Sequence, residues 1–196
     1  MFGLSKLREM ALPLAGVALA HIMGVAPACA AEPNWPTKPV TIVVGFTAGG
    51  TTDIVSRMIA PELSKLWGQP IIIDNRPGAG GNIGGGYVAK QKADGYSLFM
   101  GSSGPLTSNL AIYKNMPYDT MRDFGPVSLV ADVPNMLIVN PRAMPVKTFE
   151  EFVALIKANP GKYFYGSTGI GTASHLSAEL FKQTSGTDIT HIPYKG

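Results

Sequence analysis

An apolar run at residues 40–46, VTIVVGF, is followed at once by a segment with helical periodicity, and this order constrains the fold most. A run without polar alternation is typical of a strand covered on both faces, as in α/β proteins. From Asp53 onward apolar residues recur on one helical face, and Thr52 or Asp53 is placed to cap that helix. The next strand, helix and strand are expected at 71–74, 83–93 and 96–101. The order β-α-β-α-β predicts a parallel sheet with right-handed crossovers.

A second set of strands and helices is expected in the C-terminal third. Thr148 and Glu151 have the spacing of a capping box, which predicts a helix through Lys157. Another helix is expected over 173–184, closed by Gly186. The residues of that helix expected to face inward are Leu176, Leu180 and Phe181. Strands are expected at 163–166 and 189–194, and shorter extended segments at 127–131 and 136–139.

Both sets alternate strands with helices, so the predicted fold class is α/β with mainly parallel sheets. The chain passes from one set to the other near 132–140 without a low-complexity linker. We therefore expect a first domain over 35–134 and an incomplete second domain over 135–196. Residues 190–196 have the pattern of a strand that runs into a turn with no element after it. We interpret the chain as the N-terminal part of a longer protein.

Residues 1–30 have the order of segments that describes a secretory signal peptide. Lys6 and Arg8 precede an apolar stretch, and small residues lead to a cleavage site near Ala30. A membrane-spanning helix is disfavoured, because the stretch is shorter than the roughly 20 apolar residues that a span needs. A lipoprotein would be acylated at Cys29, but the residues before it suit that processing poorly. Export to the periplasm is the prediction.

Composition excludes several classes of function. Cys29 is the only cysteine, so the exported protein would have no thiol nucleophile, disulfide or cysteine-bound metal. The net charge of +3 is too small for a nucleic-acid footprint, and no basic run supports one. No cofactor motif is present: the glycines at 78–80 lack the third glycine of a dinucleotide loop, and Gly161-Lys162 lacks a P-loop context.

Three polar, glycine-bearing segments follow expected strands: GFTAGGTTD at 45–53, GSSGPLTSN at 101–109 and GSTGIGTAS at 166–174. The carboxyl ends of strands are where α/β sheets bind ligands. The first and third segments run directly into helices, whose free N–H groups attract carboxylate or phosphate. None of the three contains Lys, Arg or His, so an anion would be held by neutral donors. One such loop is most often an ordinary turn, but three of them indicate a binding site.

Catalytic arrangements are not evident. There is no G-x-S-x-G nucleophile elbow. His175 is expected to cap or pack at a helix start, and His191 to be structural within a strand. Asp53 and Arg57 have the spacing of a surface ion pair on a helix. Nothing in the sequence brings a nucleophile and a base together, and no histidine is expected to titrate in the site.

Several motifs, taken together and in this order, resemble the Bug proteins, the periplasmic receptors of tripartite tricarboxylate transporters. The resemblance covers residues from about Trp35 to Gly196 and is specific as a set. Its motifs are VVGFTAGGTTD at 43–53, NRPGAGGNIG at 75–84, ADGY at 93–96, Tyr113 with Tyr118-Asp119, GSTGIGTASHL at 166–176 and IPYKG at 192–196.

The resemblance implies a two-domain, flytrap-like periplasmic binding protein with a small carboxylate held between its domains. First-domain contacts would come from Phe46, Ala48, Gly49, Gly50, Thr51, Thr52, Asp53, Ser102, Ser103 and Asn109. Second-domain contacts would come from Ser167, Thr168, Gly169, Gly171, Thr172 and Ser174. The sequence departs from the family pattern at Gly45 and Leu110, where proline is common, and both changes could alter loop stiffness and ligand choice.

The function that these patterns favour is capture of a small carboxylate and its delivery to the membrane subunits of a transporter. A monomer without cofactor or metal is expected. Two alternatives remain open: an enzyme that acts on a small carboxylate, and a sensor that presents the bound ligand to a signalling partner. Because no histidine is expected to titrate in the site, affinity should be flat between about pH 6 and 8.

Overall fold

The computed structural model describes residues 35–195, and its first three strands form one parallel sheet. The central strand β1 (Val40–Val44) pairs with β2 (Ile71–Asn75) on one side and with β3 (Ser97–Met100) on the other. Val40, Val43 and Val44 are completely buried, which explains the unbroken apolar run. The predicted β-α-β-α-β order and the parallel pairing are confirmed.

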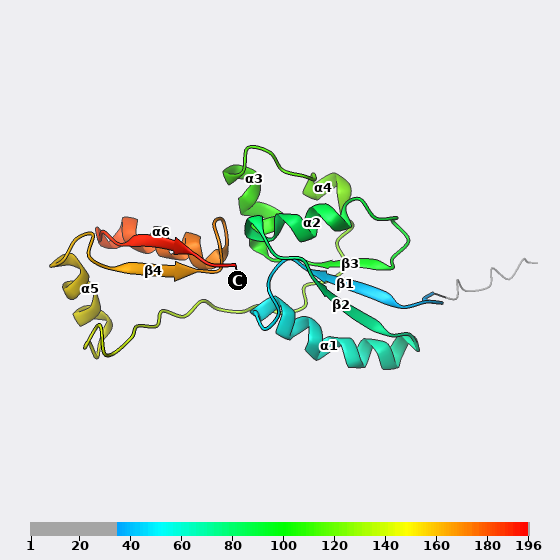
Figure 1. Cartoon of the computed structure of the whole chain (residues 1–196), viewed down its shortest axis with the longest axis horizontal. Helices are drawn as coiled ribbons and strands as arrows, with labels where there is room; N and C mark the ends of the chain where they lie inside the picture. The colour runs from blue at the N-terminus through cyan, green and yellow to red at the C-terminus, as the bar shows by residue number, and fades with distance from the viewer. Residues whose placement is uncertain (1–34, 196) are drawn as a thin grey trace, which may run out of the picture. The chain divides into compact units, whose positions relative to one another are not determined.

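Two helices cover opposite faces of this sheet (Figure 1). The first, α1 (Thr51–Trp67), ends at Gly68, which has the left-handed φ of 67° that is typical of a helix C-cap. Its N-cap is Gly50, and no side chain caps it there. The expectation that Thr52 or Asp53 caps α1 is therefore wrong: the helix starts one residue before Thr52.

The second covering helix, α2 (Asn82–Val88), is preceded by a 3₁₀ turn, η1 (Ala79–Gly81), and is shorter than predicted. Its glycines serve close packing. A β-carbon at Gly84 would lie 2.8 Å from the Cα of Gly45, and one at Gly85 would lie 2.6 Å from the Tyr118 ring. These contacts let the end of β1 and an aromatic side chain approach the helix backbone.

The predicted polar loop at 102–109 is largely helical, and this expectation is corrected. A π-helical turn, η2 (Gly104–Ser108), continues into α3 (Asn109–Ile112), and α4 (Thr120–Asp123) follows. Asp119 caps α4 by accepting the N–H groups of Met121 and Arg122. Short helical turns of this kind lack the 3.6-residue pattern over several turns that makes a helix visible in a sequence.

The C-terminal third contains a second, two-stranded parallel sheet. It is built from α5 (Phe149–Lys157), β4 (Phe164–Ser167), α6 (Ala173–Ser185) and β5 (Thr190–Pro193). The capping box is confirmed at Thr148, whose hydroxyl accepts the Glu151 N–H at 3.2 Å, while the Glu151 carboxylate reaches back to Lys147 N at 2.7 Å. Gly186 closes α6 with a φ of 64°, as predicted.

The inward face of α6 differs from the prediction. Phe181 packs against a small core of Phe152, Ile156 and Ile189. Leu180, in contrast, is 60% exposed and Leu176 is 38% exposed, so these two side chains do not enter the core. Periodicity alone predicts a broader buried stripe than a sheet of two strands can cover.

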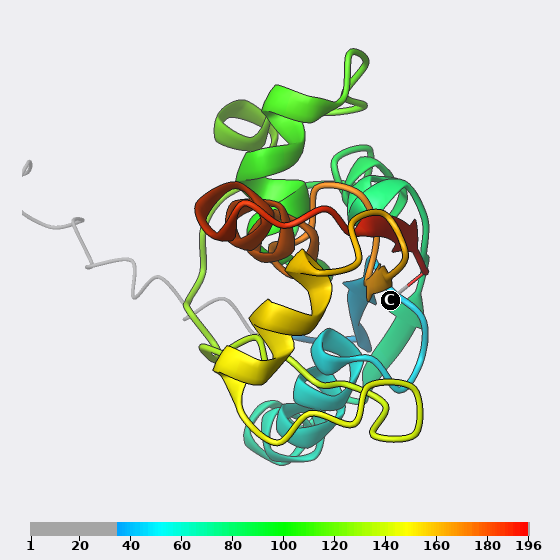
Figure 2. The same ribbon diagram turned by 90° about the vertical axis from the view of Figure 1, so that its left-hand side faces the viewer.

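Residues 126–139 form no helix or strand, and the expected extended segments at 127–131 and 136–139 do not pair (Figures 1 and 2). Seven large apolar side chains of this segment are exposed: Val127, Leu129, Val130, Val133, Met136, Leu137 and Ile138. The boundary between two domains at 134–135 stays a prediction.

Two further observations concern membrane-spanning helices and metal sites. Among residues 35–195, no helix has the length and apolarity required to cross a membrane. The same residues contain no group of histidine and acidic side chains arranged to hold a metal ion. The predicted signal peptide at 1–30, with Cys29, lies outside the described residues.

Candidate functional site

The first predicted loop leaves β1 at Val44 and enters α1 at Thr51. The Phe46 side chain, 7% exposed, belongs to the core beside Ile42 and Val44. Ala48 and Thr51 are exposed, and Gly49 has a φ of 84°. Because no side chain caps α1, its first N–H groups face out of the helix at this loop. The Thr52 carbonyl accepts the Ser56 hydroxyl at 2.7 Å within α1.

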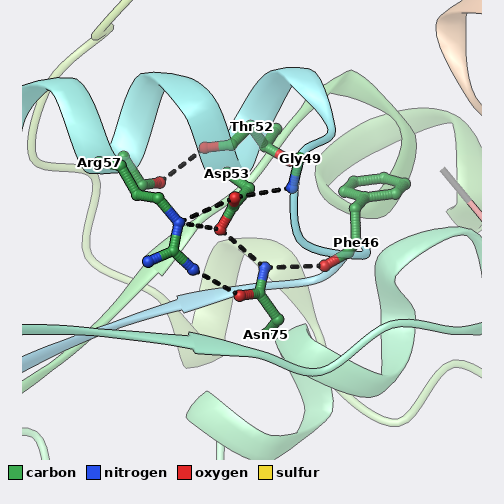
Figure 3. A network of polar contacts seen from close by, with 7 residues as sticks. Phe46, Gly49, Thr52, Asp53, Arg57 and Asn75 are labelled. Atoms are coloured by element: carbon green, nitrogen blue, oxygen red, sulfur yellow. Dashed lines mark hydrogen bonds and ion pairs between the residues drawn. The ribbon is translucent and has the colours of Figure 1, made fainter.

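Asp53 is the centre of a polar network that holds this loop (Figure 3). Its carboxylate accepts the Gly49 N–H at 2.8 Å, the Arg57 Nε–H at 2.9 Å and an Asn75 amide hydrogen at 3.0 Å. Asn75 also donates to the Phe46 carbonyl at 3.1 Å. The carboxyl group is only 2% exposed, so the expected surface ion pair is in fact half buried. Asp53 therefore positions the loop that begins at Phe46.

The hydrogen bond from Arg57, together with that from the Gly49 N–H, lowers the pKa of Asp53 from 3.8 to about 2. Burial opposes this shift, and the hydrogen bonds outweigh it. Since the pKa is lowered in the folded protein, the ionised carboxylate stabilises the fold at pH values above about 4. That contribution is lost as the pH falls toward about 2.

Asp53→Asn is expected to lower the free energy of unfolding by about 1.5–3 kcal/mol at neutral pH, because it removes the charge of a buried acceptor that takes hydrogen bonds from Gly49, Arg57 and Asn75. Urea denaturation at pH values from 7 to 2 should show the wild-type protein losing this difference between about pH 4 and 2. The exposed Asp132→Asn is the matched control and should change stability by less than about 0.5 kcal/mol. Equal losses of stability in the Asp53→Asn and Asp132→Asn variants would show that the network does not stabilise the fold.

A fourth segment, at 78–81, was not among the predicted site residues. Gly78, Ala79, Gly80 and Gly81 all have positive φ values, of 129°, 48°, 62° and 95°. Consecutive residues in such conformations can turn their N–H groups toward one side, as in anion-binding nests. The segment follows β2 and leads to α2, which also starts without a side-chain cap. The signal that could have found it is the same glycine-rich exit from a strand that singled out the other loops.

Asn109, in the second predicted segment, is completely buried. Its side-chain nitrogen donates to the Gly80 carbonyl at 3.1 Å and to the Asn82 side-chain oxygen at 2.6 Å. Two acceptors on one side fix the amide orientation, because a rotated amide would face them with oxygen. Its Oδ1 has no hydrogen-bond partner in the described structure. Asn109 thus ties the 78–81 segment to α3. Ser102 and Ser103 lie just before η2, and the Ser103 carbonyl accepts the Thr107 and Ser108 hydroxyls.

The third predicted loop, 167–174, is held mostly by its own hydroxyls. Thr172 Oγ1 donates to the Gly169 carbonyl at 2.7 Å, and Ser174 Oγ accepts the Thr168 N–H at 3.1 Å. Ser167 is buried, and its Oγ accepts the Gly169 N–H at 3.1 Å. No side chain caps α6, which starts directly after the loop. The loop is therefore held by its own hydrogen bonds and leads to a helix start without a side-chain cap.

One contact of this loop contradicts the expectation that no nucleophile and base lie close together. Ser167 Oγ lies 2.6 Å from His191 Nε2, so a hydroxyl and a potential base do meet. The pairing follows from the parallel register of β4 and β5. Ser167 is only 6% exposed and is already bonded to Gly169, which leaves its hydroxyl inaccessible to a substrate. Within the described structure, the nearby carboxylate of Glu179 is bonded to Tyr165 and Lys182. The geometry favours a structural pair.

The first and third predicted loops and the 78–81 segment contribute to a small hollow of about 50 Å³, whereas no residue of 101–109 lines it. Of the predicted site residues, Phe46 and Thr168 line it. The remaining lining residues are Gly78, Ala79, Gly80, Gly81, Tyr194 and Lys195. Lys195 brings a cation that the three predicted loops lack, and the motif at 192–196 was its only sequence signal. One more hydrogen bond joins the 166–174 segment to the end of α3. The Tyr113 hydroxyl donates to the Ile170 carbonyl at 3.4 Å.

A larger hollow of about 510 Å³ lies on the surface of α2, between Tyr87, Tyr113 and Lys90. It contains none of the predicted site residues, and its guanidinium, Arg76, is already paired with Asp74 at 2.7 Å. The smaller hollow is the stronger candidate site, because the segments that follow β1, β2, β4 and β5 line it, and the carboxyl ends of strands are where α/β sheets bind ligands.

A family model described as the tripartite tricarboxylate transporter family receptor, TctC, matches residues 55–196. The chain belongs to this family. Among its curated relatives, BugT of Bordetella pertussis is 39% identical over 174 residues, which are 88% of this chain and 53% of BugT. A UPF0065 protein of Agrobacterium vitis is 40% identical over 166 residues, 85% of this chain and 47% of the relative. This TctC-family chain spans about half the length of the relatives that it matches.

Solved structures agree with the family. An R. palustris protein with adipate has a TM-score of 0.80 and 46% identity, over 83% of this chain and 54% of that one. MatC from Rhodopseudomonas palustris, with bound malate, has a TM-score of 0.75 and 34% identity, over 82% of this chain and 54% of MatC. The periplasmic binding protein BugD has a TM-score of 0.70 and 33% identity, over 83% and 54%. The predicted periplasmic-binding-protein fold class is confirmed.

Gly45, where this TctC-family chain departs from the expected proline, has a structural explanation. A β-carbon at Gly45 would lie 2.8 Å from the Gly81 carbonyl oxygen and 2.9 Å from its Cα. Both are backbone atoms that cannot rotate away. The tight approach of β1 to the 78–81 segment therefore requires glycine at this position.

Proposed function

We propose that this protein is a periplasmic solute receptor that binds a small carboxylate and delivers it to the membrane subunits of a tripartite tricarboxylate-type transporter. Family membership supports the receptor class. Bound adipate and malate in two similar structures support the class of ligand. The receptor is proposed to act as an exported monomer, without cofactor, nucleic acid or catalytic step.

The observation that carries this proposal is one hollow lined by the segments that follow β1, β2 and β4, through Phe46, 78–81 and Thr168. These segments lead into α1, α2 and α6, which all begin without a side-chain cap. Free N–H groups at helix starts and glycine turns are donors suited to a carboxylate. Lys195 adds a positive charge. We propose the predicted residues from Phe46 to Asp53 and from Ser167 to Ser174, with 78–81, as the ligand-binding segments.

A thermal-shift screen with malate, adipate and other small dicarboxylates tests the function. A ligand that binds only the folded protein at 100 times its Kd adds about 2.7 kcal/mol, which should raise Tm by about 5–10 °C. The neutral diamide of each acid is the matched control and should leave Tm unchanged. Recovery of the acid unaltered after long incubation separates the receptor from an enzyme. Equal shifts of Tm by the acids and by their diamides would contradict the proposal.

A further inference from the structure

Two histidine rings stack against each other beside the 167–174 loop. The His175 ring, from α6, and the His191 ring, from β5, have centroids 4.2 Å apart and planes 28° apart. Each ring holds one end of the loop. His175 Nδ1 accepts the Gly171 N–H at 3.2 Å, and His191 Nε2 lies 2.6 Å from Ser167 Oγ. The loop proposed to form one wall of the ligand site is therefore anchored on two titratable groups.

The anchor at His175 depends on its protonation. A backbone N–H can only donate, so the His175 Nδ1 must be unprotonated and the ring neutral, with its hydrogen on Nε2. A proton on Nδ1 would set two donors against each other and break the bond. Gly171 is buried, so its N–H would then need another acceptor. Asn109 Oδ1, which has no partner in the described structure, lies next to Gly171.

The second ring, His191, has a pKa that depends on its burial and on the charge of the first ring. Burial lowers the pKa of His191, and the charge of His175 lowers it further. The other charged or titratable groups that face the pair are Glu179 and Lys182 from α6 and Tyr165 from β4, whose ring stacks on His191 at 4.8 Å. The Glu179 carboxylate is bonded to the Tyr165 hydroxyl and to Lys182 Nζ at 3.0 Å. Neither ring is thus paired with a carboxylate that would make protonation harmless to the loop.

We propose that the stacked histidines make ligand capture pH-dependent, with His175 as the residue that positions the loop. With both rings neutral, Gly171 is held and the wall has its binding shape. Protonation of His175 releases Gly171, and affinity for a carboxylate falls when the ring is charged. This rests on the proposed function, because it assigns regulation to the same site. It also replaces the expectation from the sequence of flat affinity between about pH 6 and 8.

The first experiment needs no ligand. In ¹H–¹⁵N NMR spectra recorded from pH 8 to 5, the Gly171 amide resonance should move in step with the imidazole signals of His175. His175→Asn keeps an acceptor near the Nδ1 position but cannot titrate, so the Gly171 resonance should stay fixed in that variant. A Gly171 resonance that is constant with pH in the wild-type protein would overturn the proposal.

The second experiment measures affinity by calorimetry with malate and adipate between pH 8 and 6. Carboxylates of pKa near 4 remain mostly ionised over this range, so the protein is the main group that titrates. Wild-type affinity should fall at least about threefold, the His175→Asn variant should bind as the wild type does at pH 8 and stay constant, and His175→Phe should bind weakly throughout. Affinity that rises on acidification, or that falls equally in the Asn variant, would overturn the proposal. Absence of binding by both acids at every pH would instead refute the proposed function, and the Gly171 resonance alone would then decide whether the rings control the loop.

Discussion

The isosteric replacement Asn109→Asp is expected to lower the free energy of unfolding by about 3–5 kcal/mol at pH 8, a large part of the 5–15 kcal/mol typical of a domain. The change replaces the only donor of this side chain by an oxygen. A buried carboxylate would then face the Gly80 carbonyl and the Asn82 side-chain oxygen, both now acceptors without this donor. Chemical denaturation followed by circular dichroism measures the loss.

The matched control is Asn115→Asp, the same chemical change at an exposed position of the neighbouring segment, which should alter stability by less than about 0.5 kcal/mol. Acidification to pH 5 should restore part of the loss in the Asn109 variant. Burial raises the pKa of a carboxyl group, so a protonated acid can donate one hydrogen bond again. Similar stability of the two variants would show that Asn109 does not connect the 78–81 segment to α3.

Gly171→Ala is expected to lower stability by about 2–4 kcal/mol and to abolish binding of malate or adipate by the proposed site. The added β-carbon would clash with Asn109 Oδ1 and would lie 3.2 Å from its Cγ. The Asn109 amide cannot retreat, since its nitrogen is held by two acceptors. A left-handed φ of 83° adds roughly 1–2 kcal/mol of strain for alanine, and overpacking adds about 1–3 kcal/mol.

Gly186→Ala separates these two causes. Gly186 also has a left-handed φ, of 64°, but nothing lies within 4 Å of an added β-carbon. This variant should therefore lose only the strain, about 1 kcal/mol, and should bind as the wild type does. Combining Gly171→Ala with Asn109→Ala should cost less than the sum of the single changes, because the smaller side chain removes the clash. Additive losses in the double variant would rule out the contact.

Local patterns in the sequence predicted most of the regular structure. The apolar run of β1, the helical period of α1 and the capping box of α5 each act within one element, so neighbouring residues are enough to specify them. The same holds for Gly186, whose left-handed conformation is required by the end of a helix. The three strand-exit loops were also visible, because glycine and hydroxyl residues cluster after each apolar run.

Only the tertiary structure decided which of these residues meet. Asp53 lies 22 positions from Asn75, and Ser167 lies 24 positions from His191, yet each pair is joined by a hydrogen bond. The parallel register of β4 with β5 creates the second pair, and the first pair joins the first turn of α1 to the last residue of β2. Likewise, Asn109 has an ordinary polar neighbourhood in the sequence but is completely buried. Periodicity and caps report on contacts within a few residues, whereas the partners of a buried polar group depend on the path of the whole chain.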